Sequence, residues 1–225
     1  MNLLAIETST ETCSAAIAIN GEVLERYQHA PRLHAELLLP WINQLLAEAG
    51  IGFSSIDAIA FSRGPGSFTS LRIGIGIVQG LAWASDRPVI PVSSLAATAQ
   101  SAADGDVDVA LVALDARMKE VFTGTFEKNS RGLMIPVTAE RVCAPEAVQV
   151  PGHSETYGIG NAFDRYPALE KLSGYLLGIR PDIWPKASSI LLLAQEWLKT
   201  HEPLSADQAQ PVYLRDNVAK KEKDR

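Results

Sequence analysis

Short apolar segments separated by polar turns open the chain and predict an antiparallel β-meander. Leu3–Ile6 and Cys13–Ile19 are apolar runs of strand length, and the polar residues Glu7–Thr12 lie between them. Glu22–Gln28 follows Asn20-Gly21, a dipeptide typical of a type I′ hairpin turn. The pattern predicts three paired strands with a polar loop after the first one.

An amphipathic helix is predicted over Leu33–Ala49, because apolar residues recur there every three or four positions. One side carries the apolar residues Leu38, Ile42, Leu45, Leu46 and Ala49, and this stripe is widened by Leu37 and Trp41. A stripe of this width fits either deep burial in the core or contact with a partner protein, and the pattern does not decide between them.

The stretch Arg63–Arg72 is the most distinctive part of the sequence. It follows an apolar segment, Ile56–Phe61, and its glycines and proline favour a sharp turn, because Gly accepts positive φ and Pro fixes φ. The next residues, Ile73–Leu81, alternate Ile and Gly but also place apolar side chains four positions apart. We interpret them as a helix, because the short apolar strand Val89–Val92 follows and completes a strand–helix–strand unit.

This second helix is weak by intrinsic propensity, since its three interior glycines each cost roughly 1 kcal/mol relative to Ala. Close packing must offset that cost. Gly76 and Gly80 lie one turn apart and are expected to leave a groove on the helix surface. Such a groove suits close contact with the chain's own sheet, with a helix of a partner, or with both on opposite sides.

A boundary between two lobes is expected at Asp104-Gly105-Asp106, a polar tripeptide that follows a predicted small-residue helix, Ser94–Ala103. The boundary divides the chain into residues 1–104 and 105–225. We expect the first lobe to carry the helices that bind a partner, and the last helix and tail of the second to pack back on the first.

The second lobe is expected to repeat the opening arrangement of the first. An apolar strand, Val109–Leu114, ends in Asp115, and Glu120–Phe126 alternates as a half-buried strand beside Leu133–Val142. Each half therefore begins with a buried strand that delivers a carboxylate, followed by a hairpin. Later, the pattern predicts a short helix, a short strand and a final amphipathic helix, at Pro145–Val150, Tyr157–Gly160 and Ala187–Lys199.

Composition narrows the function classes. The 225 residues are 47% hydrophobic and 20% charged, as in ordinary globular proteins, and the net charge is −6. A surface that binds nucleic acid directly needs clustered Lys and Arg, so the acidic balance argues against one. Cys13 and Cys143 are expected as buried thiols in a reducing cytosol. No signal peptide or membrane-length apolar run is evident, so we expect a cytoplasmic protein without membrane contact.

The chain resembles the bacterial TsaB family, also called YeaZ, in three places: Arg63–Arg72 with Ile73-Gly74 after it, Asp115-Ala116-Arg117-Met118, and Pro211-Val212-Tyr213-Leu214-Arg215. The resemblance implies a two-lobed α/β fold of the actin, sugar-kinase and heat-shock ATPase superfamily, with a mixed sheet flanked by helices in each lobe. It also implies an accessory subunit for making threonylcarbamoyladenosine beside the anticodon of transfer RNA, which meets the RNA only through a complex.

The same resemblance implies three protein partners. A TsaB protein forms a homodimer alone, a heterodimer with the catalytic subunit TsaD, and a larger assembly when the ATPase TsaE joins that pair. We expect the interface to contain Leu38, Trp41, Ile42, Leu45, Arg63, Phe68, Arg72, Ile73, Gly76, Ile77 and Gly80. Leu38 and Ile77 are expected to point outward. Arg63 and Arg72 would either pair with a partner's carboxylates or a phosphate, or cover apolar neighbours with their stems.

Two loops are compared with the nucleotide site of the superfamily, where one hairpin loop per lobe faces the phosphates and carries a carboxylate. Glu7-Thr8-Ser9 and Asp115-Ala116-Arg117 occupy these places here. Glu7 stands where Asp is usual, and the first loop lacks the Gly that lets a phosphate approach the backbone. We expect vestiges of a nucleotide site, with no cofactor held tightly by this chain alone and ATP or ADP at the interface of the complex.

No catalytic or metal site is expected. The histidines contain no pair three or four residues apart, the spacing that puts two ligands on one helical face, and we expect surface or helix-start roles for His29, His34, His153 and His201. No Gly-x-Ser-x-Gly or Cys–His arrangement indicates a nucleophile. The sequence favours a pseudo-enzyme that acts as a scaffold. The alternatives are a stand-alone ATPase or phosphotransferase and a glycoprotease-like peptidase.

Overall fold

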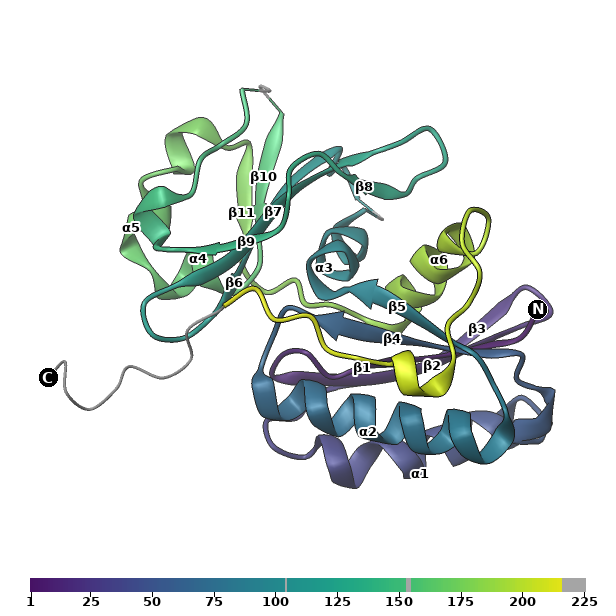
Figure 1. Ribbon diagram of the computed structural model, residues 1–225. Helices are drawn as coiled ribbons and strands as arrows, with labels where there is room; N and C mark the ends of the chain where they lie inside the picture. The colour runs from purple at the N-terminus through teal and green to yellow at the C-terminus, as the bar shows by residue number, and fades with distance from the viewer. Residues whose placement is uncertain (104, 153–154, 216–225) are drawn as a thin grey trace, which may run out of the picture.

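Two mixed β-sheets organise the chain, of which the computed structural model describes residues 1–103, 105–152 and 155–215 (Figure 1). Asp104, His153 and the charged tail from Asp216 lie outside these ranges. The first sheet has the strand order β3-β2-β1-β4-β5, from β1 Leu3–Glu7, β2 Thr12–Ile19, β3 Glu22–His29, β4 Ala58–Gly64 and β5 Val89–Ser93. The second has the order β11-β10-β6-β7-β8, with β9 also paired to β7, from β6 Val109–Asp115, β7 Val121–Lys128, β8 Met134–Pro136, β9 Arg141–Cys143, β10 Thr156–Ile159 and β11 Gly178–Arg180.

Helices cover both faces of the first sheet (Figure 1). The α-helices are α1 His34–Glu48, α2 Phe68–Ser85, α3 Ser94–Ala102, α4 Ala162–Arg165, α5 Pro167–Glu170 and α6 Ala187–Trp197, and single 3₁₀ turns lie at Phe53–Ser55, Pro145–Ala147, Ser173–Tyr175 and Ala206–Gln208. Within the described ranges, no helix combines the length and the apolar character that a membrane span requires.

The predicted opening meander is confirmed. β1 pairs antiparallel with β2, and β2 pairs antiparallel with β3. Asn20 and Gly21 have φ values of +51° and +85°, the left-handed conformation that a type I′ turn requires at both central residues. β4 and β5 then join in parallel beside β1, which makes the sheet mixed.

Alternation along β1 separates two layers of core. Leu4 and Ile6 pack with side chains of α1 and α2 on one face of the sheet. Leu3 and Ala5 pack with Ile190 and other residues of α6 on the opposite face. Because strand side chains alternate between faces, a five-residue strand supplies both layers. The final helix is therefore part of the core of the first sheet, although it follows the second sheet in the sequence.

The single strand predicted over Leu133–Val142 is wrong, because this segment forms the two short strands β8 and β9. Pro136 has no amide hydrogen to continue the ladder with β7. The amides of Val137 and Thr138 both donate to the carbonyl oxygen of Thr125, at 2.8 and 3.4 Å, and the chain leaves the sheet there. The sequence pattern also does not predict β11 or α4, since three or four residues are too few to show a period.

The last described segment, residues 204–215, is here called the strap. It leaves α6 and runs along α2 toward the second sheet (Figure 1). Leu204 and Val89 exchange backbone hydrogen bonds of 2.8 and 2.9 Å at the edge of the first sheet. Ala209 is fully buried in the core beneath α2, where its carbonyl oxygen accepts a 2.9 Å hydrogen bond from Gln79 Nε2.

The strap then crosses from one lobe to the other. The amide of Val212 donates to the carbonyl oxygen of Arg63 at 2.7 Å, at the end of β4. Three residues later, Arg215 donates to the carbonyl oxygen of Ala116 at 3.1 Å and pairs with Glu120 in the turn between β6 and β7. The strap therefore ties the ends of two strands that belong to different sheets.

Candidate functional site

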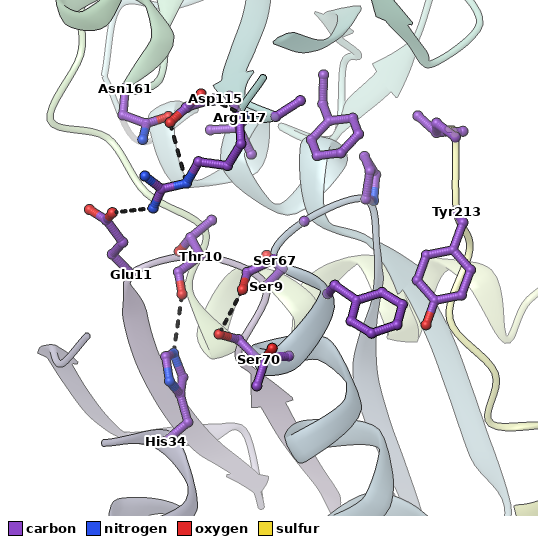
Figure 2. Close-up of a pocket in the computed structure, with 18 of the residues that line it drawn as sticks. Ser9, Thr10, Glu11, His34, Ser67, Ser70, Asp115, Arg117, Asn161 and Tyr213 are labelled. Carbon is purple, nitrogen blue, oxygen red and sulfur yellow. Dashed lines mark hydrogen bonds and ion pairs between the residues drawn. The ribbon is translucent and has the colours of Figure 1, made fainter. Parts of the chain in front are cut away.

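A cleft of about 940 Å³ lies where the loops after β1, β4 and β6 meet (Figure 2). The N-terminus of α2 and the strap complete its walls. Its lining combines hydroxyl groups with aromatic rings, among them Ser9, Ser67, Ser70, Phe68, Phe122, Trp184 and Tyr213. Thr10 and Glu11 lie on one side of the cleft, opposite Asp115 and Arg117 (Figure 2). This is the place at which the two predicted hairpin loops would hold a nucleotide.

Glu7, the predicted carboxylate of the first loop, is buried in the core and does not line the cleft. Its Oε1 accepts a hydrogen bond from the amide of Ser9, and its Oε2 has no hydrogen-bond partner. Burial raises the pKa of Glu7 from 4.5 to about 7, although the hydrogen bond from the amide of Ser9 opposes the shift. The carboxyl group is thus poorly placed to organise a metal in the cleft.

Asp115, the carboxylate of the second loop, borders the cleft with its charge already paired. Arg165 Nη1 donates to Asp115 Oδ2 at 2.6 Å, and Tyr166 Oη donates to Asp115 Oδ1 at 2.6 Å. Burial alone would raise the pKa of Asp115, but these hydrogen bonds and one from the amide of Arg117 lower it below its usual value. Arg165 and Tyr166 escaped the sequence analysis, because they sit at the end of a four-residue helix and in no motif.

The histidines of the described ranges do not gather into a metal site. His34 is buried at the start of α1, with Nε2 3.1 Å from the carbonyl oxygens of both Thr10 and Thr12. His29 Nε2 lies 3.7 Å from Glu11 Oε2. The structure places no group of three or more His, Cys, Asp or Glu residues, within the ranges it describes, where they could hold a metal ion.

The residues predicted for the partner interface fall into two groups. Leu38, Ile42 and Leu45 expose at most 2% of their surface and belong to the core beneath the first sheet, so the expectation that Leu38 points outward is wrong. The centre of the apolar stripe on α1 faces the sheet. The second group is accessible: Phe68 and Arg72 are exposed, whereas Trp41, Arg63, Ile73 and Ile77 are half-buried.

The glycines of α2 have contrasting surroundings. Gly74 is buried against Thr8, and a Cβ added there would overlap Thr8 Oγ1 and lie 3.1 Å from Thr8 Cγ2. Gly76 and Gly80 are exposed, and an added Cβ would meet no atom within 4 Å. The glycine side of α2 that faces away from the sheet, with Ile73, Gly76, Ile77, Gly80 and Trp83, is here called the glycine face. It leaves an open strip of helix backbone on the described chain.

The two arginines that flank the turn have partners within the chain. Arg72 Cζ lies 3.8 Å from the ring centre of Phe68, and Arg72 Nε donates to Tyr213 Oη at 3.0 Å. Arg63 Nη2 lies 3.6 Å from Glu140 Oε2. Arg72 thus contacts two aromatic residues of the cleft wall, whereas Arg63 pairs with a residue outside it. Contact of either arginine with another protein stays a prediction.

These features define a class: a two-lobed α/β protein with a cleft between its lobes and an open helical face. The family model described as TsaD, tRNA N6-adenosine threonylcarbamoyltransferase, matches residues 26–223. Two curated proteins named tRNA threonylcarbamoyladenosine biosynthesis protein TsaB, from Escherichia coli and Haemophilus influenzae, are each 38% identical to this chain. The matches cover 97% of this chain and 96% and 95% of the relatives. The chain belongs to the TsaB family.

Solved structures agree with this assignment. An uncharacterised protein from Pseudomonas aeruginosa, described as similar to peptidase YeaZ, is 42% identical with a TM-score of 0.89. YeaZ from the same organism is 41% identical with a TM-score of 0.86, and both matches cover 95% of this chain and 99% of the other. The two-lobed α/β fold is thereby confirmed. A tRNA N6-adenosine threonylcarbamoyltransferase from Thermomicrobium roseum is 36% identical, over only 42% of this chain and 31% of the relative.

Proposed function

We propose that this chain is a non-catalytic scaffold subunit that binds and activates TsaD in the cytoplasm, with TsaE joining the pair, for synthesis of threonylcarbamoyladenosine in transfer RNA. The glycine face of α2 carries the proposal. Gly76 and Gly80 together cost the helix about 2 kcal/mol of propensity, yet they pack against nothing within the described chain. That cost is understandable if a helix of another subunit packs there.

The chemistry of the glycine face suits a helix as its partner. Without a Cβ at two positions one turn apart, a second helix can approach the backbone closely. Ile73 and Ile77 are half-buried beside the glycines, and Trp83, with 76% of its surface exposed, stands at the end of the strip as an apolar anchor. The same surface can pair with its own copy in an isologous homodimer when TsaD is absent.

The cleft supports a scaffold role over catalysis. The carboxyl group of Glu7 lies in the core, and that of Asp115 is neutralised by Arg165, so the two vestigial loops offer a metal no free carboxylate. We propose that this chain alone holds no tight cofactor and that ATP or ADP binds at the interface of the complex. The net charge of −6 supports contact with transfer RNA through the complex rather than through this subunit.

The experiment uses a glycine substitution that should improve the helix while blocking the partner. Gly80→Gln is expected to raise the free energy of unfolding by about 0.5–1 kcal/mol, because Gln is the better helix former. A Gln side chain on the open strip should lower TsaD affinity about 100-fold, since overpacking a close interface costs about 2–3 kcal/mol. Calorimetric titration with TsaD and a transfer RNA modification assay measure the two consequences.

Gly174→Gln is the matched control. Gly174 also has open space around its Cβ position but lies in the second lobe, away from α2. It should bind TsaD with unchanged affinity. If Gly80→Gln remains folded, binds TsaD as wild type does and supports full modification, the glycine face is not the interface.

A stand-alone ATPase or phosphotransferase is the second candidate, and the volume of the cleft is the observation in its favour. The purified chain without partners would then hydrolyse ATP, and the activity would persist through repurification. Asp115→Asn would abolish it, because Asp115 is the one predicted loop carboxylate that borders the cleft. ATP hydrolysis no faster than that of a mock preparation would exclude this candidate.

A further inference from the structure

We infer that Glu11, Asp115, Arg117 and Arg165 form an ionic latch, which holds together the two loops that border the cleft, one from each lobe. Glu11 lies in the loop between β1 and β2 of the first sheet. The other three belong to the second lobe, at the end of β6, in the turn after it and in α4. Figure 2 shows Glu11 and Arg117 reaching toward each other across the cleft.

Arg165 is the centre of the latch, because it binds one carboxylate from each lobe. Its Nη1 donates to Asp115 Oδ2 at 2.6 Å. Its Nη2 lies 3.1 and 3.2 Å from the two carboxylate oxygens of Glu11. Arg117 adds a second bridge, with Nη2 3.0 Å from Glu11 Oε1 and Nε 3.7 Å from Asp115 Oδ2. Two carboxylates and two guanidinium groups therefore form a closed, charge-balanced set.

Burial decides which of these pairs matters. The Asp115 side chain is 5% exposed, so its pair with Arg165 within the second lobe is weakly screened and fixes the guanidinium group. The bridge between the lobes joins Arg165 to Glu11, whose side chains are 36% and 28% exposed. The Arg117 side chain is 69% exposed, and an exposed pair contributes little. Removing Arg165 would leave a buried carboxylate with reduced compensation, whereas removing Glu11 breaks only the bridge between the lobes.

The backbone of the turn between β6 and β7 adopts an unfavourable left-handed conformation. Arg117, Met118 and Lys119 are three consecutive non-glycine residues with φ of +62°, +53° and +62°. Each left-handed residue costs roughly 1 kcal/mol relative to ordinary backbone. Asp115 Oδ1 accepts a hydrogen bond from the amide of Arg117 at 2.8 Å. Arg215 of the strap donates a hydrogen bond to the carbonyl oxygen of Ala116 in the same turn. The latch and the strap thus hold the turn against the first lobe.

This arrangement places positive guanidinium groups between two carboxylates at the cleft between the lobes. In a protein whose lobes close on a ligand, removal of the ligand releases the lobes. Here the closing groups are part of the chain. Opening of the cleft therefore depends on ionic strength and on these four side chains, in addition to the strap.

The test compares amide hydrogen exchange in wild type, Glu11→Gln and Arg165→Gln, each in 50 mM and 500 mM NaCl. In low salt, both variants should exchange about fivefold faster than wild type in residues 8–12 and 116–120. High salt should speed the wild type toward the variants and affect the variants less, because the Arg117–Glu11 pair remains in Arg165→Gln. The double variant, with both substitutions, should show less acceleration than the two single effects combined, because both substitutions remove the Glu11–Arg165 bridge.

Glu48→Gln serves as the control, since the exposed Arg26–Glu48 pair joins β3 to α1 within the first lobe. It should leave exchange in both loops at the wild-type rate. The inference is overturned if Glu11→Gln exchanges like wild type in both loops, or if the acceleration is equal in the buried strands β1 and β6. Arg165→Gln that fails to fold leaves the decision to Glu11→Gln, which keeps the Asp115–Arg165 pair.

Discussion

Glu7 is the most unusual residue of the first sheet, because its carboxyl group is buried. It is fully buried at the end of β1, with one oxygen lacking a hydrogen-bond partner. The sequence placed a carboxylate correctly at the end of a buried strand. It could not show that the side chain stays in the core, because alternation along a strand does not tell which face carries a cleft.

The pH dependence of stability tests this burial. The unfolded chain releases the proton of Glu7 near pH 4.5 and the folded chain near pH 7. The contribution is fully present below pH 4.5 and is lost as the pH rises through 7, by about 3 kcal/mol. Glu7→Gln lacks this titration, so its free energy of unfolding should vary less between pH 5 and 8.

Urea denaturation at pH 5 and pH 8 measures the free energy of unfolding of both proteins. Glu127→Gln, which replaces an exposed carboxylate on β7, is the control. The control should keep the wild-type pH dependence. An equal loss of stability with pH in wild type and Glu7→Gln would mean that Glu7 ionises normally in the folded chain.

The glycines of α2 give a second prediction for single residues. Gly74→Ala should lower the free energy of unfolding by about 1–3 kcal/mol, because its Cβ would overlap Thr8. Gly76→Ala, whose Cβ would enter open space, should raise it by about 1 kcal/mol. Chemical denaturation of both variants is the measurement, and a stabilising Gly74→Ala would show that Thr8 moves aside freely.

The length of a helix or strand largely decides whether the sequence predicts it. The sequence predicts the meander, α1, α2, β5 and α3 well, because each has a clear period or a distinctive turn. It fails for β8, β9, α4 and β11, which have three or four residues each. Their positions depend on contacts with neighbouring strands, and such contacts leave no local pattern.

The strap supplies a prediction for an element without regular structure. Ala209→Asp should lower the free energy of unfolding by about 3 kcal/mol or more, because a charge would enter the core beneath α2 without a partner. Gln210→Asp, at the exposed neighbouring position, should change it by less than about 0.5 kcal/mol. Thermal or urea unfolding distinguishes them. Equal stability of the two variants would show that the strap is dispensable for the first lobe.

At the scale of the whole molecule, the sequence indicates two lobes and a last helix and tail that pack back on the first, but not the ion pairs that join their loops. Arg165 and Glu11 are 154 positions apart, and neither stands in a motif. Of the residues predicted for a partner surface, Gly76 and Gly80 are accessible, whereas the three apolar residues at the centre of α1 are buried. A helical stripe shows how much apolar surface exists, but not how many neighbours share it.

Self-association gives the prediction at this scale. If the glycine face forms a homodimer, the melting temperature of the isolated chain should rise with its concentration, because dimerisation stabilises the folded state by mass action. Gly80→Gln should melt at one temperature over a 100-fold concentration range. Calorimetry with sedimentation equilibrium checks both statements, and a concentration-independent wild type would argue against the dimer.

The place of α6 and the strap in the sequence has a consequence during synthesis on the ribosome. The first sheet is complete in the nascent chain after residue 93, yet the helix that covers its second face begins at Ala187 and the buried Ala209 comes later still. Until then, Leu3, Ala5 and their neighbours remain uncovered. The amino-terminal half therefore keeps an exposed apolar face until the residues of α6, Ala187–Trp197, have been synthesised.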